Sequence, residues 1–122
     1  MQIFKNVWFR RFAKREKISD KALQKAIARA NEGLFDANLG GHVIKQRIAR
    51  AGQGKSSGYR TIIIFRKEDK AFFVYGFAKN AQDNISKSEL NAFKQAAKEL
   101  LALSDEQIER LLANKSLIEV KS

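Results

Sequence analysis

The sequence contains no cysteine, no proline and only one histidine among its 122 residues. Without cysteine it can form neither disulfides nor a cysteine-ligated zinc site, so a reducing compartment, the cytoplasm, is the expected location. No apolar run approaches the roughly 18 residues of a membrane-spanning helix, and the first residues lack the apolar segment of a secretion signal. We expect a single soluble domain, residues 1–122, large enough to bury a core without cross-links.

Acidic residues are also scarce, and they are unevenly placed. Lys and Arg number 24 against 13 Asp and Glu, which gives a net charge of +11. Residues 1–82 hold 18 basic and 6 acidic residues, a net charge of +12, whereas residues 83–122 hold 6 and 7, a net charge of −1. Such a charge disfavours the compact state by self-repulsion, and it therefore indicates a polyanionic partner, with nucleic acid the leading candidate. The alternative is a basic protein without such a partner.

Two β-branched and aromatic segments, residues 58–67 and 71–78, form the most apolar part of the chain. The polar pair Glu68-Asp69 separates them, so they are predicted to form an antiparallel hairpin. Both faces of both segments are apolar in the middle, which is typical of central strands that are covered on both sides.

Helical periodicity surrounds this hairpin. Trp8 and Phe12 are expected on the buried face of a first helix, whose basic face is either solvated or a contact for RNA or an acidic partner. Ser19 is expected to cap the start of a second helix, which ends at Gly33, and Ser86 and Ser104 begin capping boxes. The expected elements are a strand at 2–5, helices at 6–17 and 19–33, a turn at 36–41, a strand at 43–50, the hairpin, two C-terminal helices, and 117–120 as a last strand or a docked tail.

The order β-α-α-β-β-β-α-α predicts an α+β fold. In that fold a small antiparallel or mixed sheet carries an N-terminal αα-hairpin and C-terminal helices.

Strand pairing predicts one basic and aromatic face of the sheet. A symmetric loop at 51–58 would place Arg47 opposite Ile62, and a two-residue turn at Glu68-Asp69 would place Arg60 opposite Phe77. A one-residue bulge would move half of this set to the other face. The residues expected to share the face are Lys45, Arg47, Arg60, Tyr75, Phe77 and Lys79.

Such a face suits single-stranded RNA, because cations neutralise phosphates and an aromatic ring stacks an unpaired base for roughly 1–3 kcal/mol. The alternative for Tyr75 and Phe77 is ordinary core. RNA cleavage by attack of its own 2′-hydroxyl needs only positioning, charge stabilisation, and proton transfer by a Lys whose pKa crowded cations lower. His42 is the only imidazole, so a two-histidine ribonuclease site is excluded and a structural role is expected for it.

No cluster of carboxylates suggests a metal site, and no cofactor is expected. Residues 52–56, Gly-Gln-Gly-Lys-Ser, lack the spacing of a phosphate-binding P-loop and precede a strand rather than a helix.

Three segments carry a family resemblance: residues 44–47 (Ile-Lys-Gln-Arg), 54–60 (Gly-Lys-Ser-Ser-Gly-Tyr-Arg) and 75–80 (Tyr-Gly-Phe-Ala-Lys-Asn). Together they resemble the RelE/ParE superfamily of toxins, most closely its HigB-like, phage-derived branch. The tail from Leu103-Ser104-Asp105-Glu106 to Leu117-Ile118-Glu119-Val120 is also similar to that branch. The resemblance covers nearly the whole chain.

The resemblance implies a type II toxin that cleaves mRNA in the ribosomal A site, next to ribosomal RNA, without metal or cofactor. It also implies a cognate antitoxin, often one with a helix-turn-helix. Arg60 would stabilise the transition-state phosphate, and Lys45, Arg47 and Lys79 would be the other catalytic cations. The expected RNA-binding residues are Lys55, Tyr75 and Asn80.

The sequence departs from several relatives in lacking an evident Glu/His pair and a C-terminal Tyr, so no general base is assigned. The alternatives are a ParE-like gyrase poison and a non-catalytic module that binds RNA or the antitoxin.

Overall fold

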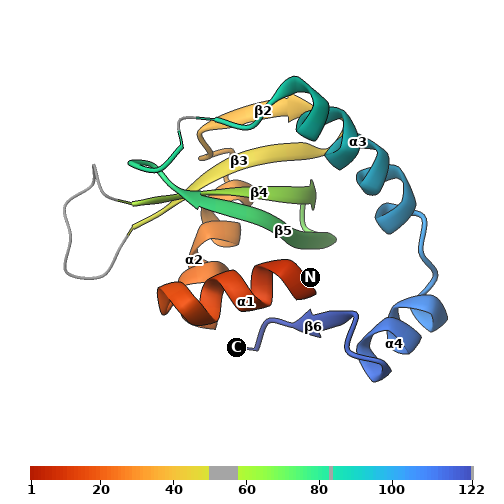
Figure 1. The fold of residues 1–122 in the computed structure, drawn as a ribbon. Coiled ribbons are helices and arrows are strands. Elements are labelled where there is room, and N and C mark those ends of the chain that lie inside the picture. Colours follow the sequence, from red (N-terminus) through yellow and green to blue (C-terminus); the bar gives the residue numbers. More distant parts are fainter. Residues whose placement is uncertain (50–57, 83, 122) are drawn as a thin grey trace.

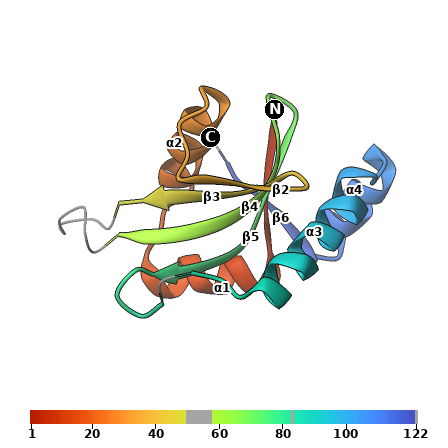
Figure 2. The same cartoon turned by 90° about the horizontal axis from the view of Figure 1, so that it is seen from above.

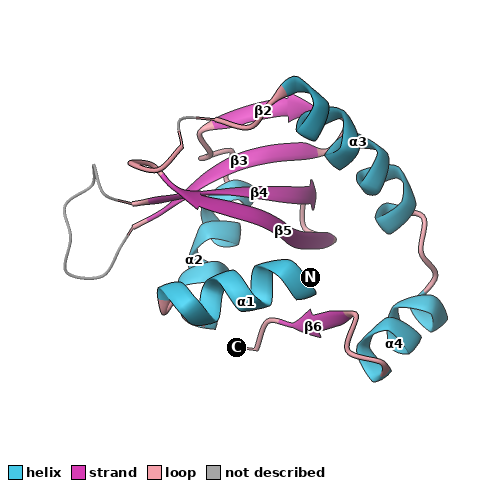
Figure 3. Ribbon diagram, in the orientation of Figure 1, coloured by secondary structure: helices cyan, strands magenta, loops and turns pink. Residues whose placement is uncertain are grey.

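A computed structural model describes residues 1–49, 58–82 and 84–121. It confirms the predicted α+β class, with helices on both sides of one mixed sheet (Figure 3). None of the helices in these three ranges is long and apolar enough to cross a membrane. In chain order the elements are β1 (Gln2–Asn6), α1 (Val7–Glu16), α2 (Asp20–Asn31), β2 (Ala37–Gly40), β3 (Val43–Ile48), β4 (Tyr59–Arg66), β5 (Lys70–Ala78), α3 (Lys87–Leu101), α4 (Asp105–Ala113) and β6 (Leu117–Glu119).

The sheet has the strand order β2-β3-β4-β5-β1-β6, and its only parallel pair among the described strands is β1 with β5. α1 and α2 pack on one face and α3 and α4 on the other (Figure 1). Viewed from above, α3 and α4 lie together on the side away from α2 (Figure 2). β4 and β5 are buried along nearly their whole length, which confirms that they are central strands.

The predicted caps begin their helices. The Ser19 hydroxyl accepts a hydrogen bond from Ala22 N at 3.1 Å at the start of α2. Ser86 and Ser104 each form a complete capping box, at α3 and α4 respectively. Such caps satisfy backbone N–H groups that have no partner within the helix. The helix boundaries therefore follow directly from local sequence.

The structure decides two open points about short segments, residues 36–41 and residues 117–120. Residues 36–41 are not simply a turn, since 37–40 form the edge strand β2, which pairs antiparallel with β3. Leu117–Glu119 is a strand, β6, and pairs antiparallel with β1. Both are edge strands of only three or four residues, too short to show a clear period in the sequence.

Trp8 lies beside Phe12 on α1, with their rings stacked at 5.4 Å between centroids, but Trp8 is not buried, contrary to the prediction. It is 42% exposed, while Phe12 is buried. Along β5, β1 pairs with residues 70–73 and no further. The helix α1, which follows β1, therefore packs beside the remainder of β5. There the Trp8 ring lies 4.5 Å from the ring of Tyr75.

The predicted register between β3 and β4 is wrong by two residues. Arg47 opposes Arg60, and Lys45 opposes Ile62. The ladder ends at the pair Ile48 and Tyr59, so the connection begins earlier than a symmetric 51–58 loop requires. Because side chains alternate with a period of two, this shift leaves the basic residues on the expected face.

The register of β4 against β5 near Arg60 is as predicted, but it arises from two compensating irregularities. The turn contains three residues rather than two, since Arg66 opposes Lys70. Ile62 then opposes Tyr75 while Ile63 opposes Phe73, so Val74 is an extra, bulged residue. Hence Arg60 still opposes Phe77.

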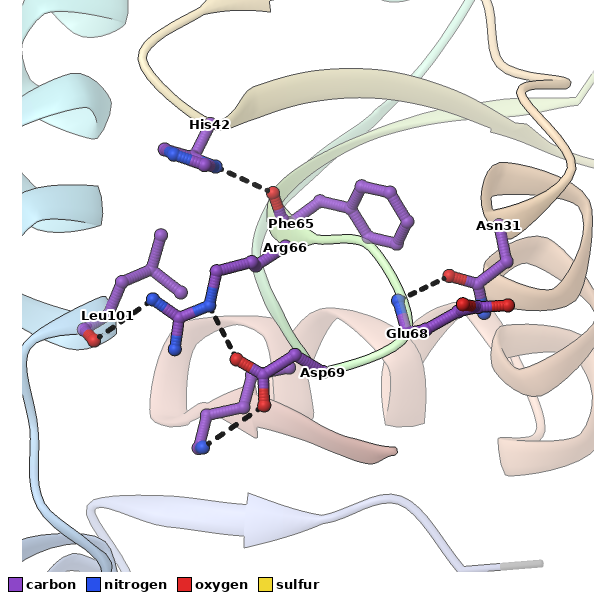
Figure 4. A network of polar contacts seen from close by, with 8 residues as sticks. Asn31, His42, Phe65, Arg66, Glu68, Asp69 and Leu101 are labelled. Atoms are coloured by element: carbon purple, nitrogen blue, oxygen red, sulfur yellow. Dashed lines mark hydrogen bonds and ion pairs between the residues drawn. The ribbon is translucent and has the colours of Figure 1, made fainter.

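Polar contacts fix the three-residue turn (Figure 4). Glu68 has a positive φ of 56°, and its N–H donates to Asn31 Oδ1 at 2.9 Å. Arg66 pairs with Asp69 across the turn. At the bulge, Asn6 Nδ2 donates to the carbonyl of Val74 at 3.1 Å. The turn and the bulge are thus both held from outside the hairpin.

Candidate nucleic-acid interface

The expected site residues gather at the ends of β3, β4 and β5. Arg47, Arg60 and Phe77 form one row across the sheet, and the next row begins with Lys45 and ends with Tyr75. Both rows face α3, since Ile62 in the second row packs in the α3-side core. The structure therefore brings these five residues together on one face.

The remaining expected residues lie beyond the strands. Lys79 is exposed directly after β5, where its backbone N–H donates to Gly58 O at 3.2 Å. Asn80 is exposed next to it. Lys55 lies outside the described residues, as does most of the predicted glycine- and serine-rich loop.

Arg60 is the most buried cation of the site, at 7% exposure. Its Nε lies 2.7 Å from Asp36 Oδ2. Asp36 comes just before β2, so the ion pair bridges β3, and Asp36 N donates to Lys45 O at 2.9 Å. The carboxylate that orients Arg60 is therefore itself attached to β3.

Two buried nitrogens of the facing arginines have no hydrogen-bond partner among the described residues. They are Nη1 of Arg60 and Nε of Arg47. A buried charged donor without a partner costs stability, and such groups are uncommon in folded proteins. Guanidinium groups bind phosphate strongly through charge-assisted hydrogen bonds. The arrangement can therefore accept an anion at the end of β3 and β4.

The two aromatic residues of the face differ in exposure. Phe77 is 5% exposed and belongs to the core, which was the alternative for it. Tyr75 is half-buried: its ring contacts Trp8 and Phe93, and its hydroxyl lies 3.3 Å from Gln82 Oε1. Tyr75, with the exposed Trp8 beside it, is therefore the aromatic residue of the two rows that reaches the surface.

Residues 1–120 match the family described as "RelE toxin of RelE / RelB toxin-antitoxin system". The chain belongs to the RelE toxin family. It is accordingly a toxin of a type II toxin-antitoxin system, within the RelE/ParE superfamily, and a cognate antitoxin is its implied partner. No curated protein matches the chain.

His42 lies away from the arginines of this RelE-family toxin. It precedes Val43, at the opposite end of β3 from Arg47, and its Nδ1 lies 3.3 Å from Phe65 O (Figure 4). Its positive φ of 65° continues the turn that Gly40 and Gly41 begin. These contacts support the structural role expected for it. In the described ranges, no group of three or more His, Asp or Glu residues is placed to hold a metal ion.

Sequence reasoning missed two residues of the candidate site. Asp36 was assigned only to a turn, because its contact with Arg60 depends on the pairing of β2, β3 and β4. Trp8 was assigned to the core, because its helical spacing from Phe12 is that of a buried pair. The one available signal for Asp36 was its isolation, since it is the only Asp, Glu, Lys or Arg between Glu32 and Lys45.

Proposed function

We propose that this RelE-family toxin is an endoribonuclease that cleaves mRNA in the ribosomal A site, as a member of the HigB-like branch. The observation that carries the proposal is the pair of buried, unpartnered nitrogens on Arg60 and Arg47. They are donors placed for an anion, on a face that also presents Lys45 and Tyr75. The resemblance of the C-terminal tail favours the HigB-like branch, and the match over residues 1–120 favours a single toxin domain.

The reaction is an internal displacement at phosphorus. The 2′-oxygen attacks the adjacent phosphorus while its proton passes to a base. The bond to the 5′-oxygen of the next nucleotide breaks, and that oxygen receives a proton. The products are a 2′,3′-cyclic phosphate and a free 5′-hydroxyl. No external co-reactant is needed for this step.

We assign each site residue a role in this reaction. Arg60 donates through Nη1 to a non-bridging oxygen, where negative charge develops in the transition state. Arg47 holds the same phosphate, while Lys45 and Lys79 are the candidates for proton transfer. Tyr75 stacks on an RNA base, and Lys55 and Asn80 contact the RNA strand. Ribosomal RNA surrounds the toxin in the A site. A cognate antitoxin with a helix-turn-helix neutralises the toxin in the cytoplasm.

The test is Arg60→Ala, expressed in bacteria under tight control beside the wild type, with new mRNA 5′ ends mapped across the transcriptome. The wild type should produce cuts inside translated codons. In Arg60→Ala the frequency of these cuts should fall by at least about 100-fold, as expected when a main transition-state donor is removed. Arg66→Ala is the matched control. It lies at the far end of the same strand and pairs with Asp69, so its cuts should persist.

Two outcomes would contradict the proposal. Growth arrest without mRNA cuts would favour a ParE-like gyrase poison. Toxicity that survives in a folded Arg60→Ala would favour a module that acts by binding alone.

A further inference from the structure

A second basic feature lies between α2 and the end of β3, outside the residues assigned above except for Arg47. It is a groove of about 420 Å³. Its cationic lining residues are Lys21, Lys25, Arg29 and Arg47, and none of the described residues that line it is acidic. Its floor includes Ala26 and Ile48.

The three cations of α2 are regularly spaced. Residues four apart lie on one face of a helix, about 6 Å apart along its axis. Lys21, Lys25 and Arg29 therefore form a row along the groove, and all three are exposed. Like charges at this spacing repel one another.

No described acidic residue relieves that repulsion by an ion pair with this row. Of the acidic residues near α2 and β2, Asp20 pairs with Lys5 and Asp36 pairs with Arg60. Glu32, the residue directly after α2, is exposed and forms no ion pair with this row. The groove thus keeps an uncompensated positive potential.

The groove is continuous with the candidate site through Arg47. Arg47 lines the groove at one end and opposes Arg60 across the sheet. Its Nε is one of the two buried nitrogens that lack a partner among the described residues. The row of Arg47 and Arg60 faces α3 and α2 packs on the other face of the sheet, so an RNA strand that contacts both passes round the end of β3 at Arg47.

We propose that the α2–β3 groove binds the phosphate backbone of RNA beyond the nucleotide held by Arg60. The inference extends the proposed function, since it supplies a track for the same ligand. It assigns Lys21, Lys25 and Arg29 to phosphate contacts and gives Arg47 a place in both sites.

The groove suits RNA better than a polypeptide. Its apolar lining consists of the small side chains of Ala22, Ala26 and Ala49 and of the buried Ile48. No large exposed apolar side chain of a described residue lines it, so an amphipathic helix would find no apolar anchor there. An extended peptide would need free backbone groups on β3. However, Arg47 N donates to Gln46 Oε1 at 3.0 Å, and Lys45 O accepts from Asp36 N. What the groove offers is charge.

The test uses the full chain and a 2′-O-methyl oligouridylate, which has no free 2′-hydroxyl and is not cleaved. The variant carries Lys21→Gln, Lys25→Gln and Arg29→Gln. The control carries Lys87→Gln, Lys98→Gln and Lys115→Gln, which lower the net charge equally on the other side of the molecule. Affinity is measured over a range of salt concentrations. Gln is a good helix former, so α2 should persist, and circular dichroism checks that it does.

The groove variant should bind at least about tenfold more weakly than the control at low salt. Its slope of log affinity against log salt should be smaller by about 2, since each lost phosphate contact removes roughly 0.7 for a single strand. Equal affinities and slopes for variant and control would overturn the proposal. So would a variant that loses binding to polyglutamate but keeps binding to RNA, because the groove would then be a protein site.

The same comparison with an RNA duplex identifies the source of the backbone. A loss confined to the single strand indicates mRNA, and a loss shared by the duplex indicates structured RNA such as that of the ribosome. Because this probe reports binding alone, a positive result stands even if no cleavage is found. A cleaving toxin whose groove variant binds normally would refute only the groove.

Discussion

Asp36 and Arg60 illustrate how a residue outside the reacting set can decide its geometry. The carboxylate occupies Nε of Arg60 at 2.7 Å and leaves Nη1 without a partner. A guanidinium is planar, so fixing Nε also fixes the direction in which its other donors point. Asp36 therefore positions Arg60, and in the proposed reaction its negative charge opposes the arrival of the phosphate.

These two effects predict a split in the kinetics of Asp36→Asn. The lost charge leaves Arg60 less firmly held, so kcat for mRNA cleavage should fall by about 10- to 100-fold, the scale of a misplaced catalytic group. KM should stay the same or decrease, because a repulsive charge has been removed from the phosphate site. Steady-state cleavage of ribosome-bound mRNA measures both quantities.

Asp36→Glu and Arg60→Ala serve as the comparisons. Asp36→Glu keeps the carboxylate and should recover part of kcat, which a purely structural defect would not allow. Arg60→Ala should lower kcat and raise KM together. If Asp36→Asn raised KM and left kcat unchanged, Asp36 would be a binding residue and not a positioning one.

At the scale of the element, the hairpin of β4 and β5 shows what sequence patterns can and cannot predict. The two strands follow from their composition, and the helix caps follow from local residues. Register depends instead on turn length and bulges. Here the three-residue turn and the bulge at Val74 cancel, so Arg60 opposes Phe77 for reasons that the sequence alone did not reveal. The error between β3 and β4 preserved the face only because it was an even number of residues.

Other features depend on contacts between distant segments. β2 has only four residues, too few for its alternation of half-buried and exposed positions to stand out in the sequence, and it forms a strand through its pairing with β3. The ion pair of Asp36 and Arg60 requires that pairing too. Trp8 has the spacing of a core residue, but the short β1 leaves its helix beside the edge of β5. Local periodicity carries no information about where such an edge lies.

Gly76 is an element-scale constraint that can be tested by mutation. A Cβ at Gly76 would lie 2.6 Å from Cε2 of Phe12, closer than side-chain atoms can approach. Gly76→Ala should therefore destabilise the protein by about 1–3 kcal/mol, the usual cost of overpacking. Chemical denaturation measures this free energy of unfolding.

Phe12→Leu supplies the matched background. The smaller side chain makes room for the Cβ, so Gly76→Ala should cost clearly less in Phe12→Leu than in the wild type. Equal costs in the two backgrounds would mean that the defect comes from the strand backbone at Gly76 and not from its contact with α1.

At the scale of the whole molecule, Asp20 joins three distant parts of the chain. Lys5 of β1 lies 2.9 Å from Asp20 Oδ1, and the backbone N–H of Lys121 donates to Oδ2 at 2.9 Å. Burial alone would raise the pKa of Asp20, but the hydrogen bonds from Lys5 and Lys121 and their charges outweigh it and hold the pKa below the ordinary value of 3.8. The first strand, the start of α2 and the C-terminal segment are thus fastened at one carboxylate.

This carboxylate makes the stability of the fold depend on pH. Because its pKa is lower in the folded state, Asp20 stabilises the fold at pH values above the unfolded pKa, and the contribution disappears as the pH falls through the folded pKa. Asp20→Asn should therefore lower the free energy of unfolding by about 1 kcal/mol near pH 7. The difference from wild type should shrink steadily below about pH 4. Denaturation of both proteins across this pH range measures the difference.

Asp105→Asn is the control, since Asp105 also begins a helix but forms no ion pair with a described residue. A loss in Asp20→Asn that was the same at pH 3 as at pH 7 would show that the side chain acts through shape and hydrogen bonding and not through its charge.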